Sequence, residues 1–98
     1  MTVEEFKKSP KPDDFPPALQ ALWHDARGDW HKAHALAQAA DDATGDWVHA
    51  YLHRKEGDAS NAAYWYSRAH QPRCTLSLEA EWEQIASALL NSSTADRA

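Results

Sequence analysis

The stretch "GDWVHAYLHRKEGD", residues 45–58, begins and ends with the same pair, Gly-Asp. Glycine readily adopts the left-handed conformation that ends a helix, and an aspartate after it accepts hydrogen bonds from the free N–H groups of the next helix. Between the two pairs, Val48, Tyr51 and Leu52 have the i, i+3, i+4 spacing of one apolar helix face. The stretch therefore predicts a helix that begins at the first pair, at Gly45, ends at the second pair, and is followed at once by another helix.

The Gly-Asp pair also occurs at Gly28-Asp29, which lies 29 residues before Gly57-Asp58. The same shift aligns apolar residues on both sides of the pair. The matched positions are Leu19/Val48, Leu22/Tyr51, Trp23/Leu52, Ala33/Ala62, Leu36/Trp65, Ala37/Tyr66 and Ala40/Ala69. Two helix-turn-helix units of equal length predict a stack of helical repeats, in which each unit buries its apolar side against its neighbour.

A further helix is expected after the repeats. Pro72 prevents the fourth repeat helix from continuing, and Thr75 or Ser77 caps the helix that follows. The apolar side of this helix comprises Leu78, Trp82, Ile85, Ala86 and Leu89. Residues 18–91 are therefore expected to form one all-α domain, a stack of two helix-turn-helix repeats with a C-terminal capping helix.

The two ends of the chain have a different composition from the repeats. Residues 1–17 are polar and rich in proline, and within them Thr2 and Glu5 have the spacing of a capping box, which predicts a single helical turn. Residues 92–98 contain no apolar pattern and are expected to be a flexible tail.

Two motifs carry a resemblance to known repeat families. The Gly-Asp pair with an alanine four residues after the aspartate resembles the "GD-x-x-x-A" junction of the tetratricopeptide repeat, and "NAAYWYSRA", residues 61–69, resembles the "KAxxWYxKA" of the related Sel-type repeat. The first helix of each unit lacks the Leu-Gly pair of the family, and the 29-residue spacing is shorter than the roughly 34 residues of tetratricopeptides. The chain also resembles small bacterial proteins that share "LWHDARGDW" and "WVHAYLHRKEGD", a likeness that implies no activity.

The repeat resemblance implies a protein-binding scaffold. The first helix of each unit would line a groove for a protein or peptide partner, or for a second copy of the chain. The residues expected to line this groove are Gln20, His24, Trp47, His49, His53 and Arg54. Trp47 directly follows a Gly-Asp pair, as Trp30 does, and each is either packed across a helix junction or an exposed anchor for a partner.

The histidines are the candidates for metal chemistry. His49 and His53 are spaced i, i+4 on one helix face, and His24 or Glu56 would have to supply a third ligand. Alternatively, His24 and His53 occupy equivalent repeat positions near helix C-termini, where a partly positive imidazole is favourable. His34 and its neighbours are interpreted as a solvated flank beside an inter-helix contact. Because the pattern holds no complete ligand set and no nucleophile–base pair, we expect no enzyme, no cofactor and no bound metal. Metal or small-ligand binding through the histidines, and a homo-oligomeric structural role, remain the alternatives.

The composition excludes several classes of partner. The chain has 98 residues, which is the size of one domain, and a formal net charge of −5 with scattered basic residues. Nucleic acids and anionic membranes require clustered Lys and Arg, so neither is expected as a partner. Cys74 is the single cysteine, so no internal disulfide is possible, and a reducing, cytoplasmic location is expected.

Overall fold

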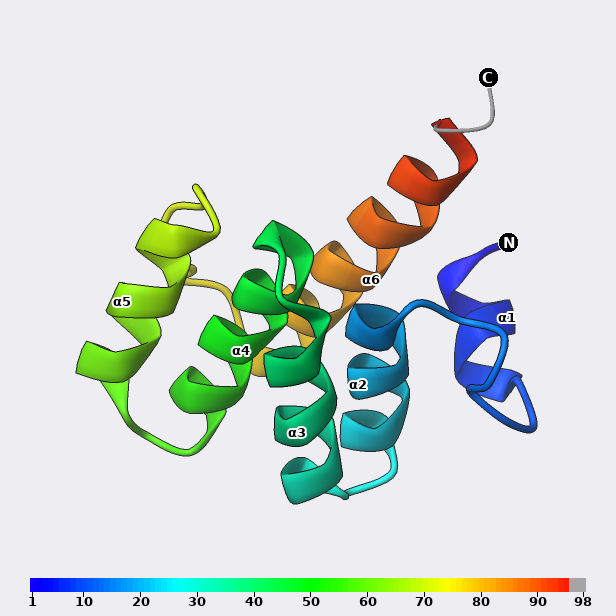
Figure 1. Cartoon of the computed structure of the whole chain (residues 1–98), viewed down its shortest axis with the longest axis horizontal. Helices are drawn as coiled ribbons and strands as arrows, with labels where there is room; N and C mark the ends of the chain where they lie inside the picture. The colour runs from blue at the N-terminus through cyan, green and yellow to red at the C-terminus, as the bar shows by residue number, and fades with distance from the viewer. Residues whose placement is uncertain (96–98) are drawn as a thin grey trace.

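The computed structural model describes residues 1–95, and the side chains of residues 1–91, as a set of helices with short connecting segments (Figure 1). The helices are α1 (Val3–Lys8), α2 (Pro17–Ala26), α3 (Trp30–Ala40), α4 (Ala43–Lys55), α5 (Ala59–Arg68) and α6 (Leu78–Ala95). The expected all-α class is confirmed for this part of the chain. None of these helices is both long and apolar enough to cross a membrane.

The turns within the α2/α3 pair and the α4/α5 pair have the same geometry. Gly28 and Gly57 have positive φ angles of 83° and 89°. The aspartates that follow them, Asp29 and Asp58, each accept a hydrogen bond from the backbone N–H three residues ahead and so cap α3 and α5. The glycine and aspartate roles predicted for these two positions are therefore confirmed.

The start of α4 differs from the prediction. The helix begins at Ala43, because the carboxylate of Asp42 accepts a hydrogen bond from the N–H of Gly45 and is the cap in place of Asp46. The left-handed position that ends α3 is taken by Asp41, with a φ of 50°. The expectation that Gly45 begins the helix from a preceding turn is wrong, since the residue lies inside the first turn of α4.

Gly45 is buried where α4 crosses close to α3. A Cβ atom added to it would lie 2.6 Å from the carbonyl oxygen of Ala37 and 2.6 Å from the Cβ of Ala40. Both distances are shorter than van der Waals contact, so only glycine allows the two helices to approach this closely.

The main core lies between the α2/α4 layer and α6, which packs against α4, α2 and α1 (Figure 1). The Trp82 indole of α6 donates a hydrogen bond to the carbonyl of Leu22 (3.0 Å). Phe6 of α1 is fully buried, stacks on Trp82 with ring centroids 5.8 Å apart, and meets Phe15 edge-on at 4.9 Å. The chain's own α1 and α6 therefore cover one side of the α2/α4 layer, where Arg54, one of the residues expected to line a groove, pairs with Glu81 of α6.

Two buried carboxylates connect the helices across this core. Each accepts one hydrogen bond from a tyrosine hydroxyl and one from a cationic side chain. The bonds are Tyr51 to Asp25 (2.8 Å), Lys55 to Asp25 (2.9 Å), Arg54 to Glu81 (2.8 Å) and Tyr66 to Glu81. Burial and the adjacent carboxylates raise the pKa of both tyrosines, so the hydroxyls stay protonated and donate. These bonds tie α2 to α4, and α6 to both α4 and α5.

Both ends of the chain contain more helix than expected. The capping box at Thr2 and Glu5 is confirmed and begins α1, which continues to Lys8 inside the segment 1–17. At the other end α6 extends to Ala95, so part of the expected tail is helical, and the remaining residues of that tail, 96–98, lie outside the described residues.

We expect Gly45→Val to lower the free energy of unfolding by about 3 kcal/mol, because the new side chain would overlap the backbone of α3. Gly57→Val meets open space and should cost only the strain of its positive φ, about 1–3 kcal/mol. Urea denaturation measures both losses. Gly28→Val is the control, and should resemble Gly57→Val because its surroundings are equally open. A smaller loss for Gly45→Val than for the other two variants would contradict the close approach of α3 and α4.

Candidate functional site

Four of the six residues expected to line a groove serve separate contacts. The Gln20 amide donates a hydrogen bond to the carbonyl of Phe15 (2.7 Å) and holds the N-terminal segment against α2. His24 is partly exposed on α2, and Arg54 pairs with α6. Trp47 is half-buried between the main core and a small apolar cluster shared by α4 and α5. The structure does not gather these four side chains on one surface.

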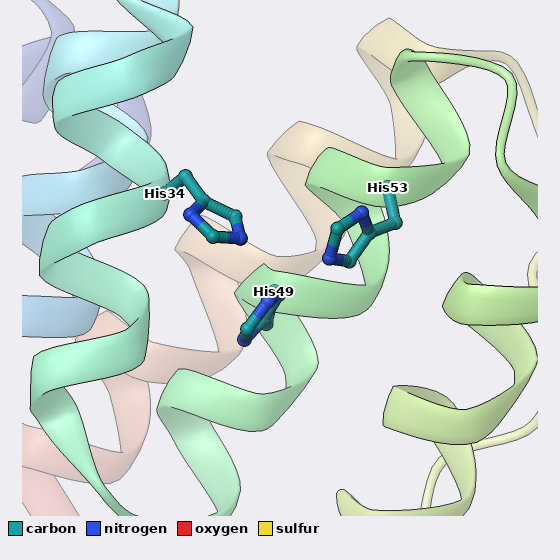
Figure 2. Close-up of side chains that lie close together, drawn as sticks. All are labelled: His34, His49 and His53. Atoms are coloured by element: carbon teal, nitrogen blue, oxygen red, sulfur yellow. The ribbon is translucent and has the colours of Figure 1, made fainter.

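The other two, His49 and His53, lie together one turn apart on α4, and His34 of α3 faces them (Figure 2). The ring centroids are 4.5 Å apart for His34 and His49, 4.7 Å for His49 and His53, and 5.2 Å for His34 and His53. One ring nitrogen from each histidine lies within 4.8 Å of the other two. We refer to these three residues as the histidine cluster.

The histidine cluster is largely shielded from solvent. His49 is 3% exposed and His53 is 8% exposed, while His34 is half-buried. In the sequence, His49 and His53 lie beside the apolar stripe of α4, and they were expected to line an open groove. That expectation of an open position is wrong for His49 and His53, because aromatic side chains of α3 and α5 pack onto them.

Two tryptophans enclose the cluster. The ring of Trp30 stacks on His34 with centroids 4.9 Å apart, and the ring of Trp65 stacks on His49 at 3.9 Å, each pair within 13° of parallel. The Trp30 indole donates a hydrogen bond to the carbonyl of Leu52 (3.0 Å) and so connects α3 to α4. Of the two roles considered for Trp30, packing across a helix junction is the one confirmed.

The hydrogen bonds of the cluster are incomplete. His53 Nδ1 lies 2.8 Å from Glu56 Oε1 and has a partner. His49 Nδ1 is buried and has no hydrogen-bond partner among the described residues. A buried polar atom without a partner costs about 1–3 kcal/mol of stability. Such an atom in a folded protein therefore requires an explanation, and a missing ligand is one.

The electrostatics of the cluster favour neutral imidazoles. Burial, together with the charges of the neighbouring His34 and His53, lowers the pKa of His49 to about 4. Burial also lowers the pKa of His34. Neutral imidazole is the form that binds metal ions, because its second nitrogen then carries a free lone pair.

The structure brings a third potential ligand beside the His49/His53 pair. His24 and Glu56 were the candidates, and the structure instead places His34 beside the pair, because α3 packs along α4 at the Gly45 contact. The sequence held one usable signal, since His34 lies one helical turn before Ala37 on α3. This spacing puts His34 and Ala37 on the same side of α3. It indicates a contact with the α4 histidines only once the structure shows that this side of α3 faces α4.

A second group of potential ligand atoms is made by His53, Glu56 and Asp58. Asp58 is engaged as the cap of α5, and Glu56 is on the surface. Exposed carboxylates near one another are common without an ion, so this group carries no assignment.

No protein family model, no curated protein and no solved structure matches the chain.

We expect acid to destabilise the metal-free protein through His49. Its pKa is about 4 in the fold and near 6.5 in the unfolded chain, so the unfolded state binds the proton more strongly. Above about pH 6.5 the ring is neutral in both states, so His49 does not lower the free energy of unfolding. As the pH falls toward 4, the free energy of unfolding decreases by roughly 3 kcal/mol in total. Urea denaturation with a chelator, at about pH 7 and about pH 4.5, measures the loss.

The control is His49→Gln, which has no titrating ring. It should lose less stability than the wild type over the same interval, because the other histidines and the carboxylates are present in both proteins and only the contribution of His49 is removed. An equal loss in both proteins would show that His49 is not the group responsible.

Proposed function

We propose that the protein binds one divalent transition-metal ion of the zinc type at the histidine cluster. The observation that carries this proposal is the convergence of three imidazoles from two helices, with ligand nitrogens within 4.8 Å of one another. The buried Nδ1 of His49 supports it, because that atom has no hydrogen-bond partner among the described residues and no donor competes with an ion for its lone pair.

The chemistry of the ligands selects the class of ion. Imidazole nitrogens suit zinc, copper, nickel and cobalt, whereas magnesium and calcium require oxygen ligands. The three residues of the cluster offer nitrogen only. Three protein ligands satisfy most of a tetrahedral zinc shell, and water or a small ligand takes the remaining position.

A purely structural role is the competing interpretation. His49 is stacked between Trp65 and His53, so the cluster also resembles an aromatic layer between α3, α4 and α5. The two roles differ in what they require of the rings. A packing role needs flat aromatic shape, and a metal site needs the nitrogen lone pairs.

We expect the wild type to bind about one equivalent of Zn²⁺ in a competition titration against a chromophoric chelator. His34→Phe keeps an aromatic ring but removes a ligand, and should weaken binding at least tenfold, about 1.4 kcal/mol. His31→Phe is the matched control, because His31 is an exposed histidine on the same helix and lies outside the cluster. It should bind zinc as the wild type does. Equal zinc binding by all three proteins would reject the site, and so would no binding by the wild type.

A second candidate function, a tetratricopeptide-like scaffold for a protein partner, is favoured by a different observation. α1 and α6 cover one side of the α2/α4 layer, but α5 carries Tyr64, which is 54% exposed. Arg68 donates a hydrogen bond to the Tyr64 hydroxyl (3.3 Å) and lies over its ring. Exposed tyrosine beside arginine is the composition of interface anchors. We infer that α5 is the side of the repeat stack available to a partner, and the partner that can be tested directly is a second copy of the chain.

For this candidate, sedimentation velocity over a range of concentrations should show dimers that are lost in Tyr64→Ser. Leu76→Ser is the control, because Leu76 is an apolar residue of similar exposure that lies outside α5. A monomer at every concentration, or equal dimer formation by Tyr64→Ser, would reject self-association through α5.

A further inference from the structure

One carboxylate outside the histidine cluster is in direct contact with it. Glu56 follows His53 by three residues, at the end of α4, and its Oε1 lies 2.8 Å from His53 Nδ1. An ionised carboxylate can only accept hydrogen bonds, so in this pair the ring nitrogen donates. The proton of neutral His53 is thereby held on Nδ1, and Nε2 keeps the free lone pair.

The geometry places that lone pair on the side of the other two histidines. Figure 2 shows one ring nitrogen of His53 turned toward His34 and His49, while the other nitrogen is turned away from them. The nitrogen turned away is Nδ1, the atom bonded to Glu56. We propose that Glu56 is a positioning residue for the metal site, which fixes the tautomer and the ring orientation of His53 so that Nε2 faces the ion. This inference rests on the proposed function.

The backbone holds Glu56 in place for this role. Its N–H donates a hydrogen bond to the carbonyl of Leu52 (3.2 Å), and its φ and ψ of −82° and 0° keep it in the last turn of α4. Gly57, at a φ of 89°, then turns the chain away. The Glu56 carboxylate is thus presented to the ring one turn earlier on the helix.

The neighbouring carboxylate does not compete for the same bond. Asp58 accepts hydrogen bonds from the N–H and the side-chain amide of Asn61 and from the hydroxyl of Ser60. Its oxygens are therefore directed at the first turn of α5. Removing Glu56 would leave His53 without this hydrogen bond, and the ring would be free to change tautomer or rotate.

The energetic consequence follows from metal sites in general. A carboxylate that accepts the N–H of a metal-bound imidazole orients the ring and makes the opposite nitrogen a stronger ligand, and its loss typically weakens metal binding 10–100-fold.

The test compares zinc affinity and histidine tautomers in the full chain. The variants are Glu56→Ala, which removes the acceptor, and Glu56→Gln, whose side-chain carbonyl can still accept the bond from Nδ1–H. The control is Glu79→Ala, because Glu79 is an exposed carboxylate on α6 and its loss changes the net charge equally. Zinc affinity is measured by chelator competition. The His53 tautomer is read from the ¹⁵N shifts of the metal-free protein by NMR.

We expect about one equivalent of zinc in every protein, with Glu56→Ala binding 10–100-fold more weakly than the wild type. Glu56→Gln should stay within about threefold of the wild type, because it keeps the acceptor. Glu79→Ala should be unchanged. The metal-free wild type and Glu56→Gln should show the proton of His53 on Nδ1, and Glu56→Ala should show a mixture. Equal melting temperatures of the metal-free variants would exclude a merely structural effect.

Three results would overturn the inference, and they can be told apart. If the wild type binds no zinc, the proposed function fails and the role of Glu56 fails with it. If the wild type binds zinc and Glu56→Ala binds it equally well, the metal site stands and the role of Glu56 is rejected. If Glu56→Gln loses as much affinity as Glu56→Ala, the carboxylate acts through its charge or as a direct ligand, and positioning through the tautomer is rejected.

Discussion

The close approach of α3 and α4 at Gly45 is the contact on which the rest of the structure depends. The fully buried side chains of α3 are those of Ala33 and Ala37 alone, so this helix contributes little apolar bulk to the junction. Small side chains let two helix backbones come near each other, and the missing Cβ of Gly45 allows the shortest distance. Because the helices are this close, the Trp30 indole reaches a carbonyl of α4 and His34 reaches the histidines of α4. The junction between the two helix pairs and the candidate site are therefore consequences of one packing constraint.

The other side of α4 is organised by burial of large side chains together with paired charges. Trp82 and Phe6 bring α6 and α1 onto the α2/α4 layer, and burial of aromatic rings provides much of the driving force for a small domain. Asp25 and Glu81 are almost fully buried, yet each is bonded to a hydroxyl and a cation, so neither leaves an uncompensated charge. Buried pairs of this kind contribute orientation more than net stability. The Asp25 bonds hold α2 against α4, and the Glu81 bonds hold α6 against α4 and α5.

The histidine cluster is the part of the molecule that departs from this pattern of satisfied contacts. Everywhere in the described core, buried side-chain polar atoms have a partner, with the exception of His49 Nδ1. Departures from local consistency tend to occur at functional sites, where stability is given up for chemistry. The cost is tolerable here because Trp65 and Trp30 stack on the rings and shield them, and because burial keeps His49 and His34 neutral. A neutral imidazole keeps a lone pair on one ring nitrogen, which is the form that the proposed metal site requires.

Local patterns in the sequence were sufficient to determine the helical class and most of the helix boundaries. Gly28 and Gly57, with the aspartates after them, act through hydrogen bonds and backbone angles that involve only a few neighbouring residues, so their roles could be predicted. Gly45 has the same local pattern but a different role, because Asp42 competes as a cap and because the neighbour that excludes a Cβ belongs to another helix. The candidate site likewise has one part that local spacing determines and one part that helix packing determines. The sequence by itself determined that two histidines share one face of a helix, since that depends only on spacing along the chain. The Glu56–His53 contact is likewise local, because the two residues are spaced i, i+3 at the end of one helix. The tertiary structure alone decided that His34 joins the two histidines, because the way α3 packs against α4 depends on contacts that no local pattern encodes.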